Sequence, residues 1–367
     1  MGTLRILYAL TVVFAHSELN GGVVFVGGEN AVRAFYIISG FLISYVLNTR
    51  KDYENVGKFY LSRALRIYPA YYAVALLTLL GIIVARTNFF SLYGAIPVSA
   101  DALLVISNAL IIGQDWVMFL GVSENKMIVV RQDGWGKRGL FQGLLVPQAW
   151  TLGLELSFYL VAPFIVKSTK MISVLLICSV VLRLLFILFG FDYNDPWTHR
   201  FFPFELALFL AGSLSERVLL PLWETGLLQC KYRKQILWST MATTVGYSLA
   251  YFVVPLSEIY KMGILVSMLV LFMPVAFAFQ NAYAWDRKIG ELSYPLYIGH
   301  ILVVWVNIFV AKKVNWTGKL APTFSNVLFS LIFGYLINRL ICSPMEGFRH
   351  RLSGRRSARK DINSSIL

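Results

Sequence analysis

A basic residue and an imidazole stand at the two ends of the first apolar stretch. Arg5 precedes the run ILYALTVVFA, and His16 follows it. On an α-helix this separation corresponds to about 16 Å at 1.5 Å per residue, or half of a hydrocarbon core roughly 30 Å thick. A neutral imidazole at that depth can take a proton from a hydroxyl group. We therefore predict that His16 is a general base.

The chain after His16 becomes polar and rich in glycine, with Ser17, Glu18 and Asn20 followed by Gly21 and Gly22. The apolar run is too short for a simple membrane anchor, and no small-x-small cleavage pattern of a signal peptide follows it. Such backbone at membrane depth is tolerated only where protein covers it or water lines it. The sequence therefore predicts a cavity near mid-membrane, with the imidazole on its wall.

A second motif, FYLSRALRIYPAYY, places Arg63 and Arg66 three residues apart. On a helix they share a face, and two guanidinium groups so placed can bind phosphates bidentately. The alternative is an ordinary cytoplasmic loop enriched in basic residues. The spacing alone does not separate the two interpretations.

Two further motifs carry ionisable groups inside apolar stretches, where such groups are hypotheses for function. In QAWTLGLELSFYLVAPF, Trp150 lies at the outer interface and Glu155 lies deeper, where a carboxylate could orient an imidazole. In SYPLYIGHILV, His300 shares a helical face with Tyr297 and Tyr294. The alternative for His300 is a hydrogen-bonded packing residue. Other ionisable groups in apolar stretches also have structural alternatives. Arg33 and Glu155 could snorkel, and Arg183 and Glu205 could form an ion pair.

The composition of the chain indicates what kind of fold positions these residues. The chain is 57% hydrophobic and 14% charged, with a mean hydropathy of +0.66. These values indicate an all-α polytopic membrane bundle, and they exclude a water-soluble chain and an outer-membrane barrel. We attribute the net charge of +14 to basic cytoplasmic loops and predict no nucleic-acid partner. Because Cys178, Cys230 and Cys342 lack metal-ligand spacing, we expect no metal site and no disulfide framework.

The apolar runs predict ten transmembrane helices. A further run at 101–113 is predicted not to span, because spanning would place the later basic loops outside. Segment 87–149 is then an external loop whose apolar piece lies on or dips into the membrane, with Trp116 and Trp135 at the interface. Both termini are expected in the cytoplasm. We predict one transmembrane domain over 1–341 and a basic cytoplasmic tail over 342–367, in which the stretch RHRLSGRRSARK is disordered and contacts anionic lipid. The ten predicted spans are 4–16, 31–48, 68–86, 150–166, 171–190, 201–219, 236–256, 261–281, 292–311 and 323–341.

Taken together these stretches resemble the bacterial membrane acyltransferase-3 family, and the resemblance covers nearly the whole chain. The chain differs from the usual pattern of this family at two points. Gly2-Thr3-Leu4 replaces the acidic residue and glycine that often precede the first-helix arginine, and no hydrolase-like domain follows the last span. The matching motifs, in chain order, are Arg-x10-His at Arg5 and His16, FYIISGFLIS with Ser39, Arg-x-x-Arg at Arg63 and Arg66, WTLGLE with Trp150 and Glu155, FPFELALFLAGSL with Gly212, and LSYPLYIGH with His300.

The resemblance implies a ten-helix inner-membrane enzyme that moves an acyl group from cytosolic acyl-CoA, in the first instance acetyl-CoA, to a sugar hydroxyl. The acceptor would be a lipid-linked or exported polysaccharide. The phosphates would be held by Arg63 and Arg66 with Arg5. His16 would act as the base, or an acyl-enzyme would form. The resemblance further implies that Glu155 or Glu18 holds the tautomer of His16. It also implies that His300, Ser39 and Tyr297 position the acceptor or the oxyanion, and that Trp150 binds substrate.

Other classes of protein compete with this interpretation. A transporter or flippase for lipid-linked oligosaccharide would also explain ten spans and buried charges, although its usual inverted repeats are not visible. A membrane glycosyltransferase would want neighbouring acids in the first external loop, where Glu18 and Glu29 are far apart. A purely structural or sensory role is a further alternative. The oligomeric state is not fixed by the sequence, and a homodimer is one option.

Overall fold

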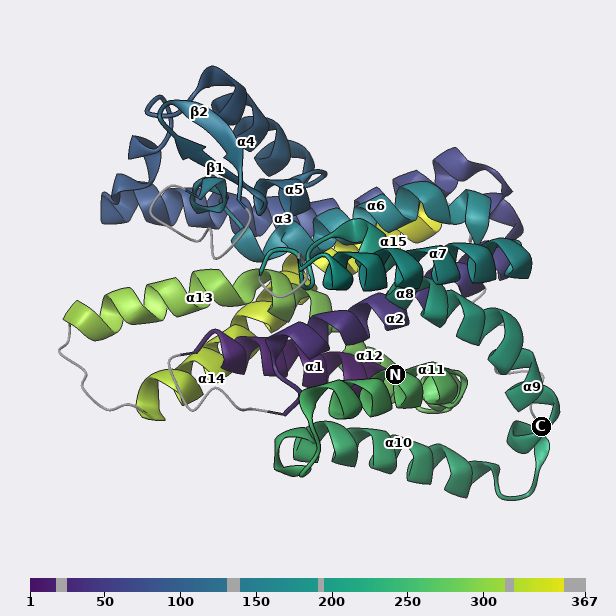
Figure 1. Cartoon of the computed structure of the whole chain (residues 1–367). Coiled ribbons are helices and arrows are strands. Elements are labelled where there is room, and N and C mark those ends of the chain that lie inside the picture. The colour runs from purple at the N-terminus through teal and green to yellow at the C-terminus, as the bar shows by residue number, and fades with distance from the viewer. Residues whose placement is uncertain (18–24, 131–138, 191–194, 314–319, 353–367) are drawn as a thin grey trace.

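The structure is a computed structural model of the chain, and it describes residues 1–17, 25–130, 139–190, 195–313 and 320–352. Helices form nearly all of it, which confirms the predicted all-α membrane fold (Figure 1). A helix occupies each predicted span. These helices are α1 (Gly2–Ala15), α2 (Gly28–Thr49), α3 (Val56–Ala85), α6 (Trp150–Ile165), α7 (Thr169–Leu188), α8 (Phe202–Leu214), α10 (Arg233–Ala250), α11 (Glu258–Ala282), α13 (Ser293–Lys313) and α14 (Leu320–Ile337).

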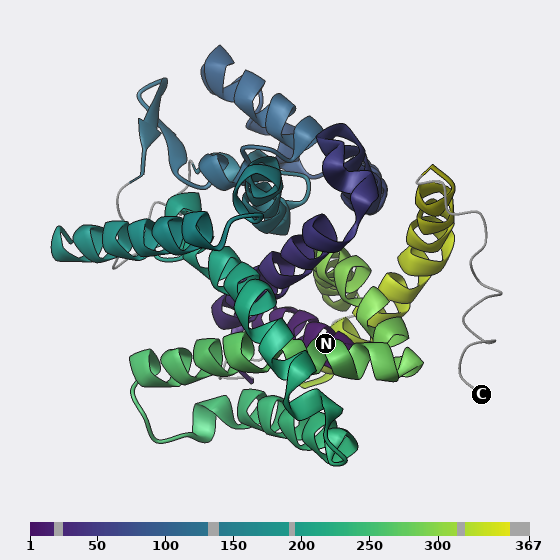
Figure 2. The same ribbon diagram turned by 90° about the vertical axis from the view of Figure 1, so that its right-hand side faces the viewer.

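Seven helical segments of the described chain are long and apolar enough to cross a membrane. Four of them are the single helices α2, α3, α7 and α11. The other three are formed by consecutive helices: α8 with α9 (Leu220–Thr225), α12 (Ala284–Glu291) with α13, and α14 with α15 (Ser343–Leu352). With 14 and 16 residues, α1 and α6 are shorter, and α10 begins with Arg233, Lys234 and Gln235. Figure 2 shows α10 beside α11 at the edge of the bundle. The count of ten spans stays a prediction.

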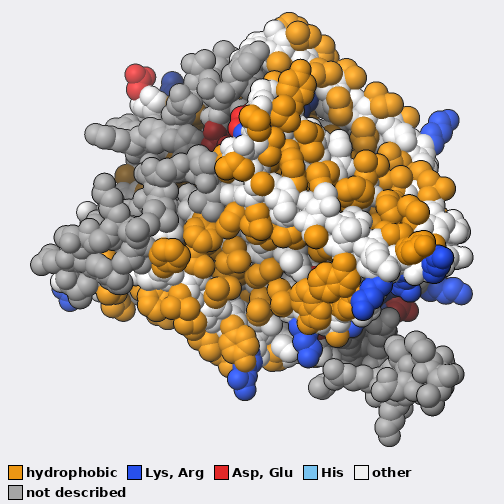
Figure 3. Space-filling model, turned by 90° about the horizontal axis from the view of Figure 1, so that it is seen from below, with side chains coloured by type: hydrophobic (Ala, Val, Ile, Leu, Met, Phe, Trp, Pro, Cys, Tyr) orange, Lys and Arg blue, Asp and Glu red, His pale blue; other side chains and the backbone are white. Residues whose placement is uncertain are grey.

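The surface of the bundle has the pattern of a membrane protein. Figure 3 shows one face covered by apolar side chains, with Lys and Arg gathered mainly along one edge. The exposed apolar residues include Leu184 and Leu188 on α7 and Val84 on α3. An apolar face of this extent is what lipid tails solvate, because soluble proteins rarely expose one.

Helices α1 and α13 run in the same direction. At one end the Asp286 carboxylate of α12 accepts hydrogen bonds from the backbone amides of Gly2 and Thr3, at 2.7 and 2.8 Å. At the other end the His16 and His300 rings lie together, with centroids 4.9 Å apart. We call these the Asp286 end and the His16 end. The arrangement carries Arg5 and His16 to opposite ends of α1, as predicted.

Two glycines bring α2 against α8. A Cβ atom at Gly40 would lie 1.9 Å from the carbonyl oxygen of Phe209, and one at Gly212 would lie 2.0 Å from that of Ile37. Backbones this close leave no space for any side chain, which is the usual reason for small residues between membrane helices. Both glycines belong to motifs noted in the sequence, Gly40 to FYIISGFLIS and Gly212 to FPFELALFLAGSL. Their function is therefore packing, and it fixes the position of Ser39 beside Gly40.

Gly40→Ala is expected to lower the free energy of unfolding by about 1–3 kcal/mol or more, because α2 and α8 must separate to admit the methyl group. The measurement is thermal unfolding in detergent. Gly81→Ala on α3 is the control, since a Cβ there meets no atom within 4 Å. Equal melting temperatures for the two variants would contradict this account of the α2–α8 contact.

The loop predicted over 87–149 folds as a lobe at one end of the bundle (Figure 1), with α4 (Val98–Leu110), α5 (Gln114–Val117) and a hairpin of β1 (Leu120–Ser123) and β2 (Lys126–Val129). Helix α4 covers the ambiguous run and is too short to span. Its last carbonyls accept hydrogen bonds from three hydroxyl groups of α3, at 2.5–2.7 Å. The donors are Tyr68, Tyr71 and Tyr72. A helix end satisfied in this way can lie at membrane depth without spanning. Trp116 is exposed, and Trp135 lies outside the described residues.

The C-terminal tail begins as a helix, which runs into the first residues of the stretch from Arg349 that was expected to be disordered. Helix α15 extends to Leu352 and packs against α3. Arg349 and Glu346, three residues apart, pair on this helix, and such a pair stabilises helical structure. Residues 353–367 lie outside the described part of the chain, so the predicted disorder and lipid contact there stay predictions.

Candidate active site

A cavity of about 110 Å³ lies between α1, α2, α3, α6 and α13. Its three polar zones follow from the directions of these helices. Arginines from α1 and α3 line the Asp286 end, a carboxylate and a hydroxyl line the middle, and aromatic residues line the end nearer the histidines. The polar lining residues are Arg5, Arg63, Arg66, Ser39, Glu155, Thr151, Ser293, Tyr36, Tyr159, Tyr294 and Tyr297.

The three arginines of the cavity carry an uncompensated positive charge. Arg63 is 7% exposed, and its Nε has no hydrogen-bond partner in the described chain. No ion pair among the described residues joins Arg5, Arg63 or Arg66 to a carboxylate. The predicted convergence of Arg63 and Arg66 is confirmed, because both line the cavity. Three guanidinium groups without carboxylate partners suit an anion with several oxygens, such as a phosphate.

Glu155 is the carboxylate in the described lining of the cavity, and it is already engaged. Its Oε1 accepts a hydrogen bond from Ser39 Oγ at 2.7 Å and another from the Tyr159 hydroxyl. The sequence predicted that Glu155 or Glu18 orients His16, but Glu155 ties α6 to α2 instead. Glu18 lies outside the described residues. Both donors belong to other cavity-lining residues, so the Glu155 carboxylate organises the middle of the cavity.

His16 is oriented by its own helix. Its Nδ1 lies 2.9 Å from the Val12 carbonyl oxygen, and Nδ1 of His300 lies 2.5 Å from the carbonyl oxygen of Tyr297. A carbonyl oxygen only accepts hydrogen bonds, so each Nδ1 carries the proton and each Nε2 carries a lone pair. The His16 ring is exposed and His300 is fully buried. Two adjacent imidazoles thus present basic nitrogens, of which that of His16 is the accessible one.

Neither histidine lines the cavity, which differs from the prediction of an imidazole on its wall. Tyr297 lines it, and the Tyr297 ring lies 5.7 Å from that of His300 and 5.9 Å from that of Phe35, between centroids. The Tyr297 hydroxyl bonds to Thr151 Oγ1 at 2.8 Å. Tyr297 therefore lies between the cavity and His300.

Trp150 does not line the cavity but lies against Arg200, which belongs to a polar network at the start of α2. The Arg200 guanidinium lies 4.2 Å from the centre of the Trp150 ring, and it donates to both oxygens of Asp195 at 2.6 and 2.9 Å. His199 lies between Asp195 and Glu29, with 3.7 Å from a ring nitrogen to an oxygen of each. Burial, followed by nearby arginines, lowers the pKa of His199 well below its usual value, so its ring is neutral at pH 7.

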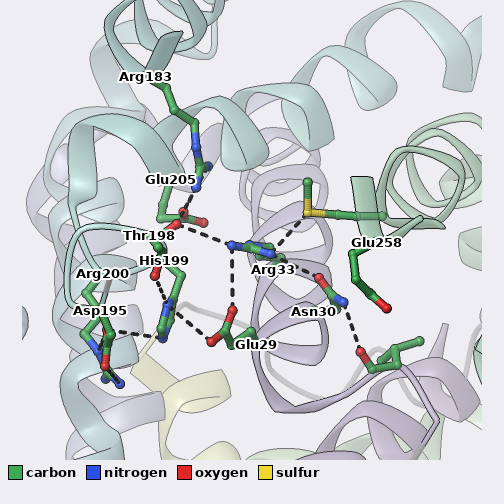
Figure 4. A network of polar contacts seen from close by, with 12 residues as sticks. Glu29, Asn30, Arg33, Arg183, Asp195, Thr198, His199, Arg200, Glu205 and Glu258 are labelled. Atoms are coloured by element: carbon green, nitrogen blue, oxygen red, sulfur yellow. Dashed lines mark hydrogen bonds and ion pairs between the residues drawn. The ribbon is translucent and has the colours of Figure 1, made fainter. Parts of the chain in front are cut away.

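The charges of this network are balanced, which indicates a structural role. The predicted ion pair between Arg183 and Glu205 is confirmed at 3.3 Å. Arg33 does not snorkel; it donates to the Asn30 side chain at 3.1 Å and to the Thr198 carbonyl at 3.3 Å. Figure 4 shows these arginines interleaved with the acids around His199. The network fastens the start of α2 to the segment before α8.

Asp115 is a buried acid that the sequence analysis missed. It is 2% exposed, and a Cβ at Gly153 would lie 2.8 Å from its Oδ1. Burial raises its pKa to about 6, against the opposing backbone amides of Asp115 and Trp116. The glycine in WTLGLE is therefore where α6 accommodates the lobe. An acidic residue within the apolar run IIGQDWVMF was a visible signal for a buried acid. Its contact with Gly153 could not be predicted, because Gly153 is distant in the sequence.

Asp115→Asn is expected to stabilise the protein above pH 6 and to have no effect near pH 4. The unfolded carboxyl ionises near pH 3.8 and the folded one near 6, so the wild type loses about 3 kcal/mol as pH rises between these values. Melting temperatures from pH 4 to pH 8 test this, with exposed Asp52→Asn as the control. Parallel curves for wild type and Asp115→Asn would contradict the assignment.

Comparison with known proteins identifies relatives of this chain. A family model described as "Acyltransferase domain" matches residues 2–342. An uncharacterized protein of Aquifex aeolicus (strain VF5) is 23% identical over 213 residues, which are 57% of this chain and 91% of that protein. No solved structure matches. The family match contains the cavity, the histidine pair and the polar network.

Proposed function

The chain belongs to the acyltransferase-3 family, and from this premise we propose that it transfers an acetyl group from acetyl-CoA to a sugar hydroxyl of a lipid-linked or exported polysaccharide. One observation carries the proposal. Three arginines without carboxylate partners among the described residues lie toward the Asp286 end, and an exposed imidazole lies at the opposite end of α1. The first group suits the phosphates of a nucleotide thioester, and the second suits proton transfer from a hydroxyl.

The donor enters at the Asp286 end. The phosphates of acetyl-CoA bind Arg63 and Arg66, with Arg5 beside them, and the pantetheine arm extends through the cavity. The arm and the small acyl group occupy the cavity between α1, α2, α3, α6 and α13. Since CoA is cytosolic, the proposal implies that the Asp286 end and both termini lie on the cytoplasmic side of the inner membrane.

The acyl group reaches the histidine pair after the Tyr297 ring moves aside. His16 Nε2 takes the proton of the acceptor hydroxyl, and the resulting oxygen nucleophile attacks the thioester carbon. The tetrahedral intermediate collapses, the C–S bond breaks, and the CoA thiolate takes the proton from His16. His300, whose Nε2 is buried beside the His16 ring, supports the charge that develops on His16.

The acceptor approaches at the His16 end, where His16 is exposed. A hydroxyl of a lipid-linked or exported glycan reaches that end from the membrane or from the external side. Ser39 is bonded to Glu155 and lies in the middle of the cavity, so it positions the thioester arm rather than the acceptor. Trp150 positions the polar network through Arg200.

The test uses protein in nanodiscs with labelled acetyl-CoA and extracted lipid-linked glycan. We expect label in the glycan, release of CoA, and a rise in melting temperature with CoA that exceeds the rise with pantetheine. A flippase would move the glycan without consuming acetyl-CoA. Glycan translocation with no CoA binding and no label transfer would contradict the proposal.

A further inference from the structure

Four tyrosines line the cavity, and one hydroxyl differs from the others. Tyr159 donates to Glu155, Tyr294 donates to the Ile67 carbonyl at 2.6 Å, and Tyr297 bonds to Thr151. Tyr36 is only 3% exposed, so water does not reach its hydroxyl. This hydroxyl nevertheless has no hydrogen-bond partner among the described residues. A buried hydroxyl without a partner costs about 1–3 kcal/mol.

Aromatic stacking holds the ring of Tyr36 in its position. It stacks on Phe209 with centroids 4.7 Å apart and planes at 28°, and Phe209 stacks in turn on Phe158 at 4.6 Å and 19°. A phenylalanine at position 36 would make the same stack without the cost of the unpaired hydroxyl. Packing therefore explains the ring and does not explain the oxygen, which points to a ligand as its partner.

The position of Tyr36 along the cavity indicates which part of the ligand it meets. Ser39 of α2 bonds to Glu155 of α6, and the starts of both helices lie at the network around Arg200 and Thr198. Tyr36 is one turn before Ser39, so it lies toward Tyr297 and away from the arginines. With phosphates at the arginines, this end receives the acyl end of the thioester.

We propose that the Tyr36 hydroxyl donates a hydrogen bond to the acyl carbonyl oxygen of the bound thioester. The inference rests on the proposed function. When the acceptor oxygen attacks the carbonyl carbon, the C=O electron pair moves onto this oxygen. The hydrogen bond strengthens as the charge develops, and the pair returns as the C–S bond breaks. A donor placed at a developing oxyanion accelerates the reaction without reorganising.

Tyr36→Phe tests this in nanodiscs through turnover, stability and a spectroscopic readout. We expect kcat to fall by about 10²–10³-fold with KM for acetyl-CoA unchanged and with a melting temperature equal to or above that of the wild type. In the infrared spectrum of a bound ketone analogue of acetyl-CoA, labelled with ¹³C at the carbonyl, the C=O stretch should move to higher frequency in the variant.

Tyr294→Phe is the matched control, because it removes a cavity hydroxyl that has a protein partner. It should lower the melting temperature and leave the carbonyl stretch unchanged. Wild-type kcat in Tyr36→Phe, an unshifted carbonyl band, or an effect confined to KM for the glycan would each overturn the inference. A wild-type protein that neither binds the analogue nor transfers acetyl would overturn the proposed function, and this inference with it.

Discussion

Replacing His16 with alanine is expected to reduce acyl transfer by about 10²–10⁴-fold, the usual contribution of a general base. The variant should fold, because His16 is exposed and, among the residues that the structure describes, its Nδ1 bonds only to the Val12 carbonyl of its own helix. Binding of CoA at the arginines should be unchanged. The measurement is the transfer rate at saturating acetyl-CoA, together with the melting temperature and its shift with CoA.

His199→Ala is the matched control for His16→Ala. His199 is a buried ring in a network of balanced charges, so its loss should lower the melting temperature and leave turnover per folded molecule close to wild type. His300→Ala should give an intermediate loss, since that ring contacts His16. Transfer at the wild-type rate by folded His16→Ala would show that another group removes the proton.

The second large effect is expected from Arg63→Gln/Arg66→Gln. Each charge-assisted hydrogen bond to a phosphate contributes about 1.5–3 kcal/mol, so KM for acetyl-CoA should rise by about 10²-fold or more while kcat changes little. The dependence of KM on salt should also weaken, because two of the three cavity arginines are gone. Steady-state kinetics at several salt concentrations measure both effects.

Acetyl-pantetheine, which lacks the nucleotide phosphates, separates this role from a structural one. Wild type and the double variant should use it equally poorly, because the two arginines have no phosphate to bind. Exposed Lys170→Gln on α7 controls for the loss of a positive charge and should have wild-type kinetics with both donors. A double variant with unchanged KM for acetyl-CoA would place the nucleotide elsewhere.

The helices could be predicted from the sequence because apolar length is a local property. Parity of the basic loops predicted that the run now seen as α4 does not span, and its 13 residues agree with that prediction. The three tyrosines that satisfy its end, such as Tyr68 in RIYPAYY, are visible in the sequence, but their partners are distant in the chain. The helical start of the tail was missed because basic composition was read as disorder.

The candidate site was predictable in its residues and less so in its contacts. Arg5, Arg63 and Arg66 converge as expected because helical spacing fixes their faces. The partner of His16 was assigned to a carboxylate, although a carbonyl four residues earlier on the same helix was the nearer acceptor. Tyr36 and Asp115 were not found. Tyr36 is significant because its hydroxyl has no partner among the described residues, and Asp115 because it is buried against Gly153. Only the tertiary structure shows either property.

The most direct test of the account is a cryo-EM structure with a non-transferable analogue of acetyl-CoA. We predict phosphates within hydrogen-bond distance of Arg63 and Arg66, the arm along Ser39 and Glu155, and the acyl carbonyl near the Tyr36 hydroxyl on the side facing the histidines. A nucleotide bound elsewhere, or an acyl end with no path to His16, would contradict it.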